Sequence, residues 1–116
     1  MQPKAIRLSI PAELVGQIPP YNPERQGKAE NAILCVSFRD DQTGSAYYVG
    51  EYNGEDLCWG FIKVVNRANQ FADFRLSEVS HFRNNMLIPM HLDTSFRPMT
   101  GLQLLQRIER LGTQYS

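Results

Sequence analysis

The fold is decided by one stretch of sequence, SAYYVGEY-NG-EDLCWGFIKVV, which spans residues 45–65. Two runs rich in aromatic and β-branched side chains, 45–52 and 55–65, flank the dipeptide Asn53-Gly54. Asn-Gly accepts positive φ at both central positions of a turn, so it favours the tight type I′ turn that joins twisted antiparallel strands. The stretch therefore predicts a β-hairpin, and with it a mainly antiparallel sheet.

A two-residue turn also fixes which residues of the hairpin lie opposite each other. It places Tyr48 across from Trp59, an aromatic pair that contributes about 0.2–1 kcal/mol. It places Glu51 across from Asp56, where two carboxylates repel each other. The second run, 55–65, is apolar at positions of both faces, which predicts an interior strand covered on each side.

Three further strands are predicted from β-propensity and alternation. They cover 33–38, 71–75 and 86–96, and Pro89 favours an edge position for the last of them.

Two short helices are also expected. One starts at Pro11, a residue that suits the first helical position, and is stopped within two turns by Gly16 and Pro19-Pro20. The other lies within 76–82, with Ser77 as its N-cap.

The clearest helix is predicted over 100–111, where Thr100 caps the start and Gly112 supplies the stop. Its apolar positions recur at helical spacing and are Leu102, Leu104, Leu105, Ile108 and Leu111. The resulting fold class is α+β: a mainly antiparallel sheet of four or five strands with the C-terminal helix packed on one face.

Length and composition predict a single domain over 1–116, in which the proline- and charge-rich segment 19–31 is a surface loop. No apolar run approaches the roughly 20 residues of a membrane span. The start of the chain, Met1 to Arg7, lacks the apolar core and cleavage site of a secretory signal. We therefore expect a cytoplasmic protein that does not contact a membrane.

The charges are balanced, with twelve basic and twelve acidic residues. This balance argues against a strongly basic surface dedicated to nucleic acid. A local patch remains open, because nine of the twelve basic residues are arginines, whose guanidinium groups bind carboxylate or phosphate through two hydrogen bonds.

The cysteines and histidines do not have the spacing of a metal site. Cys35, Cys58, His81 and His91 include no close pair of the kind that zinc modules use, so no metal and no cofactor are expected. In a reducing compartment the two cysteines are expected to be small buried hydrophobes, although a Cys/His nucleophile stays open. His91 and Asp93 alternate on one predicted strand and could share a face.

The candidate partner-binding surface is the hairpin and its neighbourhood. Three carboxylates cluster at the predicted turn, and they could recognise a partner, be solvated, or pair with nearby arginines. Aromatic side chains of the hairpin could stack bases beside two arginines, or build core and interface. The candidate residues are Glu51, Tyr52, Glu55, Asp56, Tyr47, Arg67 and Arg75.

Four segments carry a resemblance to a known family. They are Tyr48-Val49-Gly50-Glu51-Tyr52, Cys58-Trp59-Gly60-Phe61, Ala72 to Val79, and His91 to Pro98. In the order and spacing of these segments, residues 32–107 resemble a small uncharacterised family, a domain of unknown function carried on plasmids and conjugative elements. The resemblance implies an accessory gene of a mobile element and implies no known reaction.

The expected function is that of a non-catalytic macromolecule-binding accessory protein, which would support conjugation or inhibit a host defence. Its partner would be another protein or a protein–nucleic-acid complex. Two alternatives stay open: a single-stranded nucleic-acid-binding module, and a small enzyme. Familiar phosphate-loop, nucleophile-elbow and zinc-protease motifs do not occur in the sequence, so we favour a protein that is not an enzyme.

Overall fold

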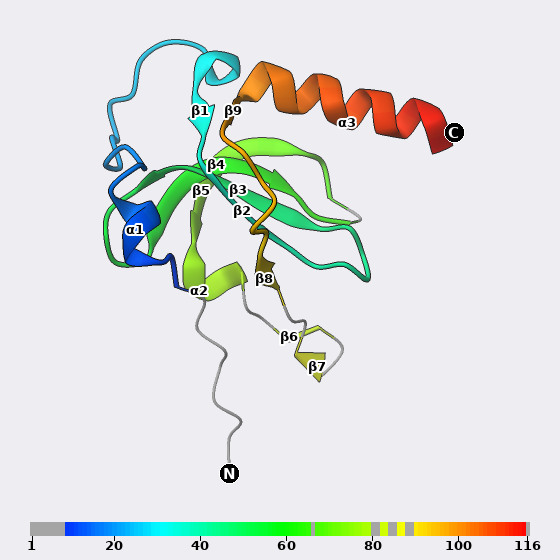
Figure 1. Cartoon of the computed structure of the whole chain (residues 1–116), viewed down its shortest axis with the longest axis horizontal. Coiled ribbons are helices and arrows are strands. Elements are labelled where there is room, and N and C mark those ends of the chain that lie inside the picture. Colours follow the sequence, from blue (N-terminus) through cyan, green and yellow to red (C-terminus); the bar gives the residue numbers. More distant parts are fainter. Residues whose placement is uncertain (1–8, 66, 80–81, 84–85, 88–89, 116) are drawn as a thin grey trace.

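The predicted hairpin forms the centre of a five-stranded antiparallel sheet, with the strand order β5-β4-β3-β2-β8 (Figure 1). The computed structural model describes residues 9–65, 67–79, 82–83, 86–87 and 90–115. The strands of the sheet are β2 (Val36–Arg39), β3 (Ala46–Tyr52), β4 (Leu57–Lys63), β5 (Gln70–Arg75) and β8 (His91–Leu92). Helix α3 (Gly101–Tyr115) packs on one face of this sheet. The predicted α+β class is confirmed.

Smaller elements surround this sheet. β1 (Ile33–Leu34) pairs with β9 (Met99–Thr100), and β6 (Phe82–Arg83) pairs with β7 (Met86–Leu87). The short helices are α1 (Ala12–Val15), the 3-10 helix η1 (Ala29–Asn31) and α2 (Leu76–Val79). Within the described residues, no helix has both the length and the apolar character needed to cross a membrane.

Two of the predicted strands are divided in the structure. The run 33–38 is split at Cys35, because β1 leaves the main sheet to pair with β9. The run 86–96 is divided between β7 and β8, so it is not one continuous edge strand. Pro89 and His81 lie outside the described residues.

The hairpin register differs from the prediction. Tyr48 lies opposite Phe61 rather than Trp59, and Glu51 lies opposite Trp59 rather than Asp56. A β-bulge between Val49 and Glu51 shifts the pairing by one residue. Such a bulge adds an unpaired residue to one strand and bends it.

The turn that joins β3 to β4 explains this difference. The side-chain oxygen Oδ1 of Asn53 accepts hydrogen bonds from the amides of Glu55, Asp56 and Leu57, at 2.8, 3.0 and 3.1 Å. The amide of Asn53 donates to the carbonyl oxygen of Leu57 at 3.0 Å. The connection is therefore a four-residue loop organised by an asparagine side chain, as in Asx turns. The predicted positive φ of Gly54 is observed, at 89°.

The sheet has a core on each face, as the apolar pattern of β4 predicts. On one face, side chains of β2 to β5 pack with those of α1 and α2. The buried side chains of this core include Phe38, Tyr47, Phe74, Leu76 and Ile10. On the other face, Leu104 of α3 is 2% exposed and packs with Phe61 and Leu34. Full burial of a side chain such as Leu104 contributes about 1.5–3 kcal/mol before entropic costs.

Helix α3 begins where the sequence predicts. The amide of Gln103 donates to Oγ1 of Thr100 at 3.1 Å, and the amide of Thr100 donates to Oε1 of Gln103 at 2.9 Å. This reciprocal pair is a capping box. The predicted stop at Gly112 is wrong, because α3 continues to Tyr115. Glycine lowers helix stability by about 1 kcal/mol relative to alanine, which does not by itself end a helix.

Candidate functional site

The acidic residue Glu51 is engaged inside the molecule. Its carboxylate accepts hydrogen bonds from Nε and Nη2 of Arg25, at 3.0 and 2.9 Å, and from the amide of Asn22 at 2.9 Å. The Glu51 side chain is only 13% exposed. Glu51, which is predicted to bind a partner, therefore holds segment 19–31 on the sheet.

Arg25 completes this attachment through aromatic contacts. Its guanidinium lies 4.4 Å from the ring centroid of Trp59 and 5.3 Å from that of Tyr21. The hydroxyl of Tyr21 donates to Asp73 at 2.7 Å, and this bond is the main cause of a raised Tyr21 pKa. Because Arg25 covers a 6% exposed Trp59, this ring is not an open platform for bases.

Asp56 also has an internal role. Its carboxylate accepts hydrogen bonds from the amide and the hydroxyl of Ser77, both at 2.9 Å, and Arg75 lies 3.9 Å away. The carboxylate thus caps α2 from the hairpin loop, and Ser77 lies within α2 instead of capping it. The hydroxyl of Tyr52 donates to the carbonyl oxygen of Glu55 at 3.0 Å. The side chains of Asp56 and Tyr52 therefore stabilise the hairpin loop and attach it to α2.

The structure does not gather the other candidate residues into one surface. Tyr47 is 6% exposed and packs on Phe74, with ring centroids 5.0 Å apart, so it belongs to the core. Arg67 follows β4, whereas Arg75 ends β5 beside the hairpin loop. Because β4 and β5 are antiparallel, these two arginines lie toward opposite ends of the sheet.

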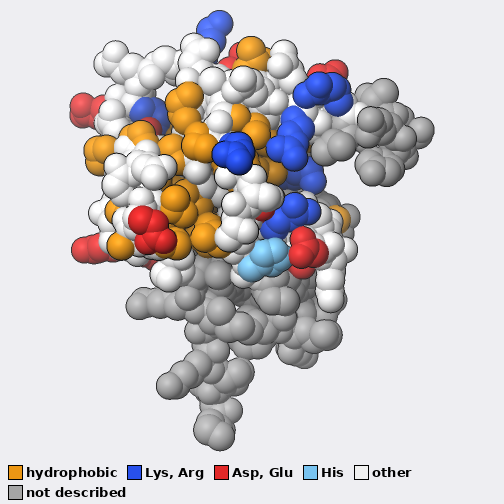
Figure 2. Space-filling view, viewed as in Figure 1, with side chains coloured by type: hydrophobic (Ala, Val, Ile, Leu, Met, Phe, Trp, Pro, Cys, Tyr) orange, Lys and Arg blue, Asp and Glu red, His pale blue; other side chains and the backbone are white. Residues whose placement is uncertain are grey.

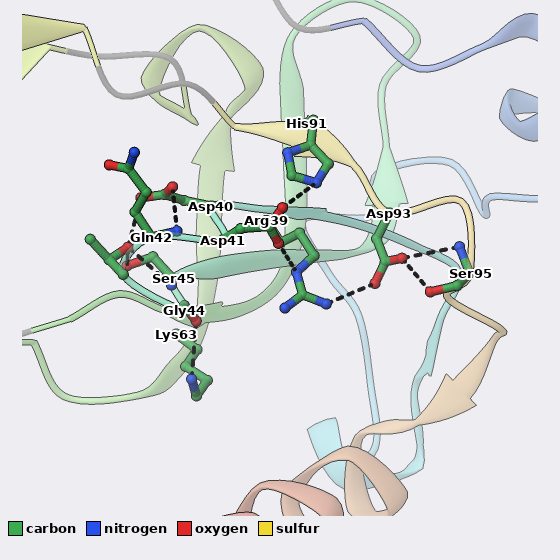
Figure 3. Close-up of polar contacts among 11 residues, drawn as sticks. Arg39, Asp40, Asp41, Gln42, Gly44, Ser45, Lys63, His91, Asp93 and Ser95 are labelled. Carbon is green, nitrogen blue, oxygen red and sulfur yellow. Dashed lines mark hydrogen bonds and ion pairs between the residues drawn. The ribbon is translucent and has the colours of Figure 1, made fainter.

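His91 and Asp93 are linked through other residues, as Figure 3 shows. Nε2 of His91 lies 3.4 Å from Asp41, and Arg39 lies 3.1 Å from Asp41 and 3.7 Å from Asp93. Asp93 accepts hydrogen bonds from the hydroxyl and the amide of Ser95, at 2.6 and 3.0 Å. The hydroxyl bond is the main cause that lowers the pKa of Asp93, and the charge of Arg39 adds to it.

Next to this chain of charges, a groove opens between the sheet and α3. Its volume is about 210 Å³, and three cations from three different elements line it: Arg39 of β2, Lys63 of β4 and Arg107 of α3. Tyr48 and Phe96 line it as well. We call this the cationic groove. The face seen in Figure 2 carries a band of Lys and Arg side chains beside hydrophobic ones.

The aromatic part of the cationic groove is held firmly. The Tyr48 ring lies 5.5 Å from that of Phe96 and 6.2 Å from that of Phe61, measured between centroids. Burial raises the pKa of the Tyr48 phenol, while the charges of Arg107 and Arg39 act in the opposite direction. Tyr48 therefore remains a neutral aromatic group among cations at physiological pH.

Asp93 is the one carboxylate that lines the cationic groove, and its lowered pKa keeps it ionised. With three cations and one carboxylate, the lining has a surplus of positive charge. Lys63 donates to the carbonyl oxygen of Gly44 at 3.1 Å, which places its ammonium group at the groove. The arrangement suits an anionic ligand that also offers an apolar or aromatic surface and a hydrogen-bond donor.

The two thiols are poorly suited to nucleophilic chemistry. Cys58 is fully buried, and burial raises its pKa to about 12. Burial also raises the pKa of Cys35. Both thiols are therefore protonated near neutral pH, and a reactive cysteine needs the thiolate. Among the described residues, no three His, Cys, Asp or Glu side chains are grouped to hold a metal ion.

Of the residues that line the cationic groove, the sequence singles out Asp93, beside His91, and Tyr48, among the hairpin aromatics, but not Arg39, Lys63 or Arg107. Arg39, Lys63, Asp93 and Arg107 are far apart in the sequence, and only the fold brings them together. One signal was available for Arg107: it falls three residues after Leu104, on the same side of the helix as part of the apolar stripe.

Comparison of the chain with protein-family models, with curated proteins and with solved structures finds no match.

Proposed function

We propose that this chain is a non-catalytic macromolecule-binding protein that contacts an anionic partner through the cationic groove. The observation that carries this proposal is the convergence of Arg39, Lys63 and Arg107 around Tyr48 and Phe96. Clustered cations steer an anionic partner and strengthen its contacts, and aromatic side chains add contact area at little entropic cost.

The size of the cationic groove favours part of a large partner over an enclosed small molecule. Its volume of about 210 Å³ lies below the roughly 300–1,000 Å³ typical of pockets that enclose drug-sized ligands. A chain that lies across the groove needs only one of its units to enter it. The acidic hairpin loop is a weaker candidate surface, because Glu51 and Asp56 are bound internally.

We further propose that the protein acts in the cytoplasm as an accessory factor of a mobile genetic element, in conjugation or against a host defence. The support for this part is the resemblance of residues 32–107 to a plasmid-borne family. It is tested by locating the gene: neighbouring transfer or replication genes would support it, and a position among unrelated chromosomal genes would contradict it.

The binding proposal is tested by capture from a lysate of the native host. Tagged wild-type protein is compared with Arg107→Gln and Arg107→Glu, and with Arg110→Gln as a control on the same helix outside the groove lining. We expect captured material to fall with both Arg107 variants and to persist with the control. Equal capture by all four proteins would contradict the proposal that the cationic groove binds the partner.

A further inference from the structure

We infer that the partner held in the cationic groove is a single-stranded nucleic acid. This inference rests on the proposed function and names the chemistry of the partner. It follows from the combination of three cations, two half-buried aromatic rings and one ionised carboxylate in a single groove.

The cations suit the phosphate backbone. Arg39 and Arg107 carry guanidinium groups, which bind phosphate oxygens through two parallel hydrogen bonds, and Lys63 adds a compact ammonium charge. Arg107 lies on an exposed position of α3. Arg39 is about half exposed and pairs with Asp41 and Asp93, so a phosphate that binds its guanidinium must compete with these two carboxylates. Neutralising phosphates releases counterions, which supplies much of the affinity of such complexes.

The remaining groups suit the bases. Tyr48 and Phe96 offer ring surface on which an unpaired base can stack. The ionised Asp93 can accept a hydrogen bond from an exocyclic amino group, as carboxylates do from cytosine N4. Bases in a duplex are stacked and paired, so the ring and carboxylate contacts select a single strand.

The same carboxylate disfavours an acidic polypeptide. Such a chain would bring its own carboxylates against Asp93, which is already ionised, and its acidic side chains have no ring to place against Tyr48 and Phe96. A nucleotide unit instead presents an anionic phosphate, an aromatic base and amino donors together. Each of these three groups has a complementary group in the lining.

The test is fluorescence anisotropy with a labelled 12-nucleotide DNA strand of mixed cytosine and thymine. For three phosphate contacts we expect log K to fall with log salt at a slope of about −2. Arg107→Gln should weaken binding about tenfold and reduce the slope by about 0.7. Arg110→Gln should change affinity by less than about twofold, and circular dichroism should show that both variants are folded.

Two unlabelled competitors separate base recognition from charge alone. An abasic strand of equal length keeps the phosphates and lacks the bases, so it should compete about tenfold less well. Poly-glutamate should compete more weakly than either strand. Equal competition by the abasic strand, or stronger competition by poly-glutamate, would overturn the inference, as would the absence of strand binding at 50 mM salt.

Failure of this inference is distinguishable from failure of the proposed function. If no strand binds but capture from lysate depends on Arg107 and survives nuclease, the partner is a protein and only the inference is wrong. If capture does not depend on Arg107 and no strand binds, both are wrong.

Discussion

Arg25 stacks over the indole of Trp59 at 4.4 Å while the same guanidinium forms two hydrogen bonds with Glu51. Trp59 and Glu51 are cross-strand neighbours in β4 and β3, so one side chain from segment 19–31 clamps both central strands. The hydrogen bonds that Arg25 donates to Glu51 raise the pKa of Arg25 above its ordinary value, so the guanidinium keeps its charge at any physiological pH.

Removing this clamp should destabilise the fold. We expect Arg25→Ala to lower the free energy of unfolding by about 1–2 kcal/mol, because it removes a cation–π contact and leaves the Glu51 carboxylate without its ion-pair partner. Arg25→Lys should recover only part of the loss, since lysine cannot form the two parallel bonds. Urea denaturation measures both changes, and Arg67→Ala is the matched control. Equal midpoints for wild type and Arg25→Ala would show that the stack contributes nothing.

Two glycines with opposite backbone geometry test the hairpin loop. Gly54 has φ 89°, so Gly54→Ala should cost about 1 kcal/mol through left-handed strain. Gly16 has φ −64° and open space around it, so Gly16→Ala should be neutral or stabilise by up to about 1 kcal/mol. Thermal melting compares the two. A Gly54→Ala protein as stable as Gly16→Ala would contradict the loop geometry.

This loop shows where prediction from the sequence succeeds and where it stops. Strand propensity and Asn53-Gly54 correctly indicate a hairpin, because both are local properties. The register was predicted wrongly, because the Asn53 side chain bonds three amides and lengthens the loop. Asn53-Gly54 is compatible with both turns, so these two residues alone do not fix the register. In the observed register Phe61 and Tyr48 both pack in the core on the α3 face.

The cationic groove could not be predicted from local sequence patterns, because its residues are far apart in the chain. Arg39, Lys63 and Arg107 meet only because β2, β4 and α3 are assembled around Tyr48. By contrast, the helix cap at Thr100 is predictable from the sequence, because the amide that it binds belongs to Gln103, only three residues away. The acidic cluster of the hairpin loop is predicted as a recognition surface, but the groups that bind Glu51 and Asp56 come from 19–31 and α2, which are distant in the sequence.

Gly60 is required by the close approach of β3. A Cβ at this position would overlap the carbonyl oxygen of Tyr48 and approach the amide of Gly50. Gly60→Ala should therefore destabilise the protein by about 3 kcal/mol or more, because backbone on both strands must move. Gly50→Ala meets atoms only at 3.3–3.4 Å and should cost less. Soluble yield and chemical denaturation measure the difference; a smaller loss at Gly60 than at Gly50 would contradict the register.

The two thiols should react at different stages of unfolding. Cys58 is fully buried and its pKa is raised to about 12, so a thiol reagent at pH 7.5 should label it only after the protein unfolds. Cys35 is partly buried, with a raised pKa, and should react slowly in the native state. Mass spectrometry of labelled peptides, with and without denaturant, distinguishes them. Fast native labelling of Cys58 would show that the core opens there.

The lowered pKa of Asp93 predicts how stability depends on pH. A carboxyl group whose pKa is lower in the folded state than in the unfolded one stabilises the fold when ionised. That contribution is complete above the unfolded pKa, about 3.9, and is lost as pH falls through the lower folded value. Asp93→Asn should therefore flatten the acid limb of the stability curve below about pH 4.

Asp93→Asn should also change how the cationic groove binds polyanions. Asp93→Asn removes the only carboxylate in the lining, so a polyanion without bases should bind more tightly to it than to wild type. The abasic strand and poly-glutamate should both gain affinity, and the mixed strand should gain less, because it loses the acceptor for its amino groups. Anisotropy competition at fixed pH and salt measures the three ratios. An equal gain for all three polyanions would show that Asp93 acts only through its charge and does not contact the bases.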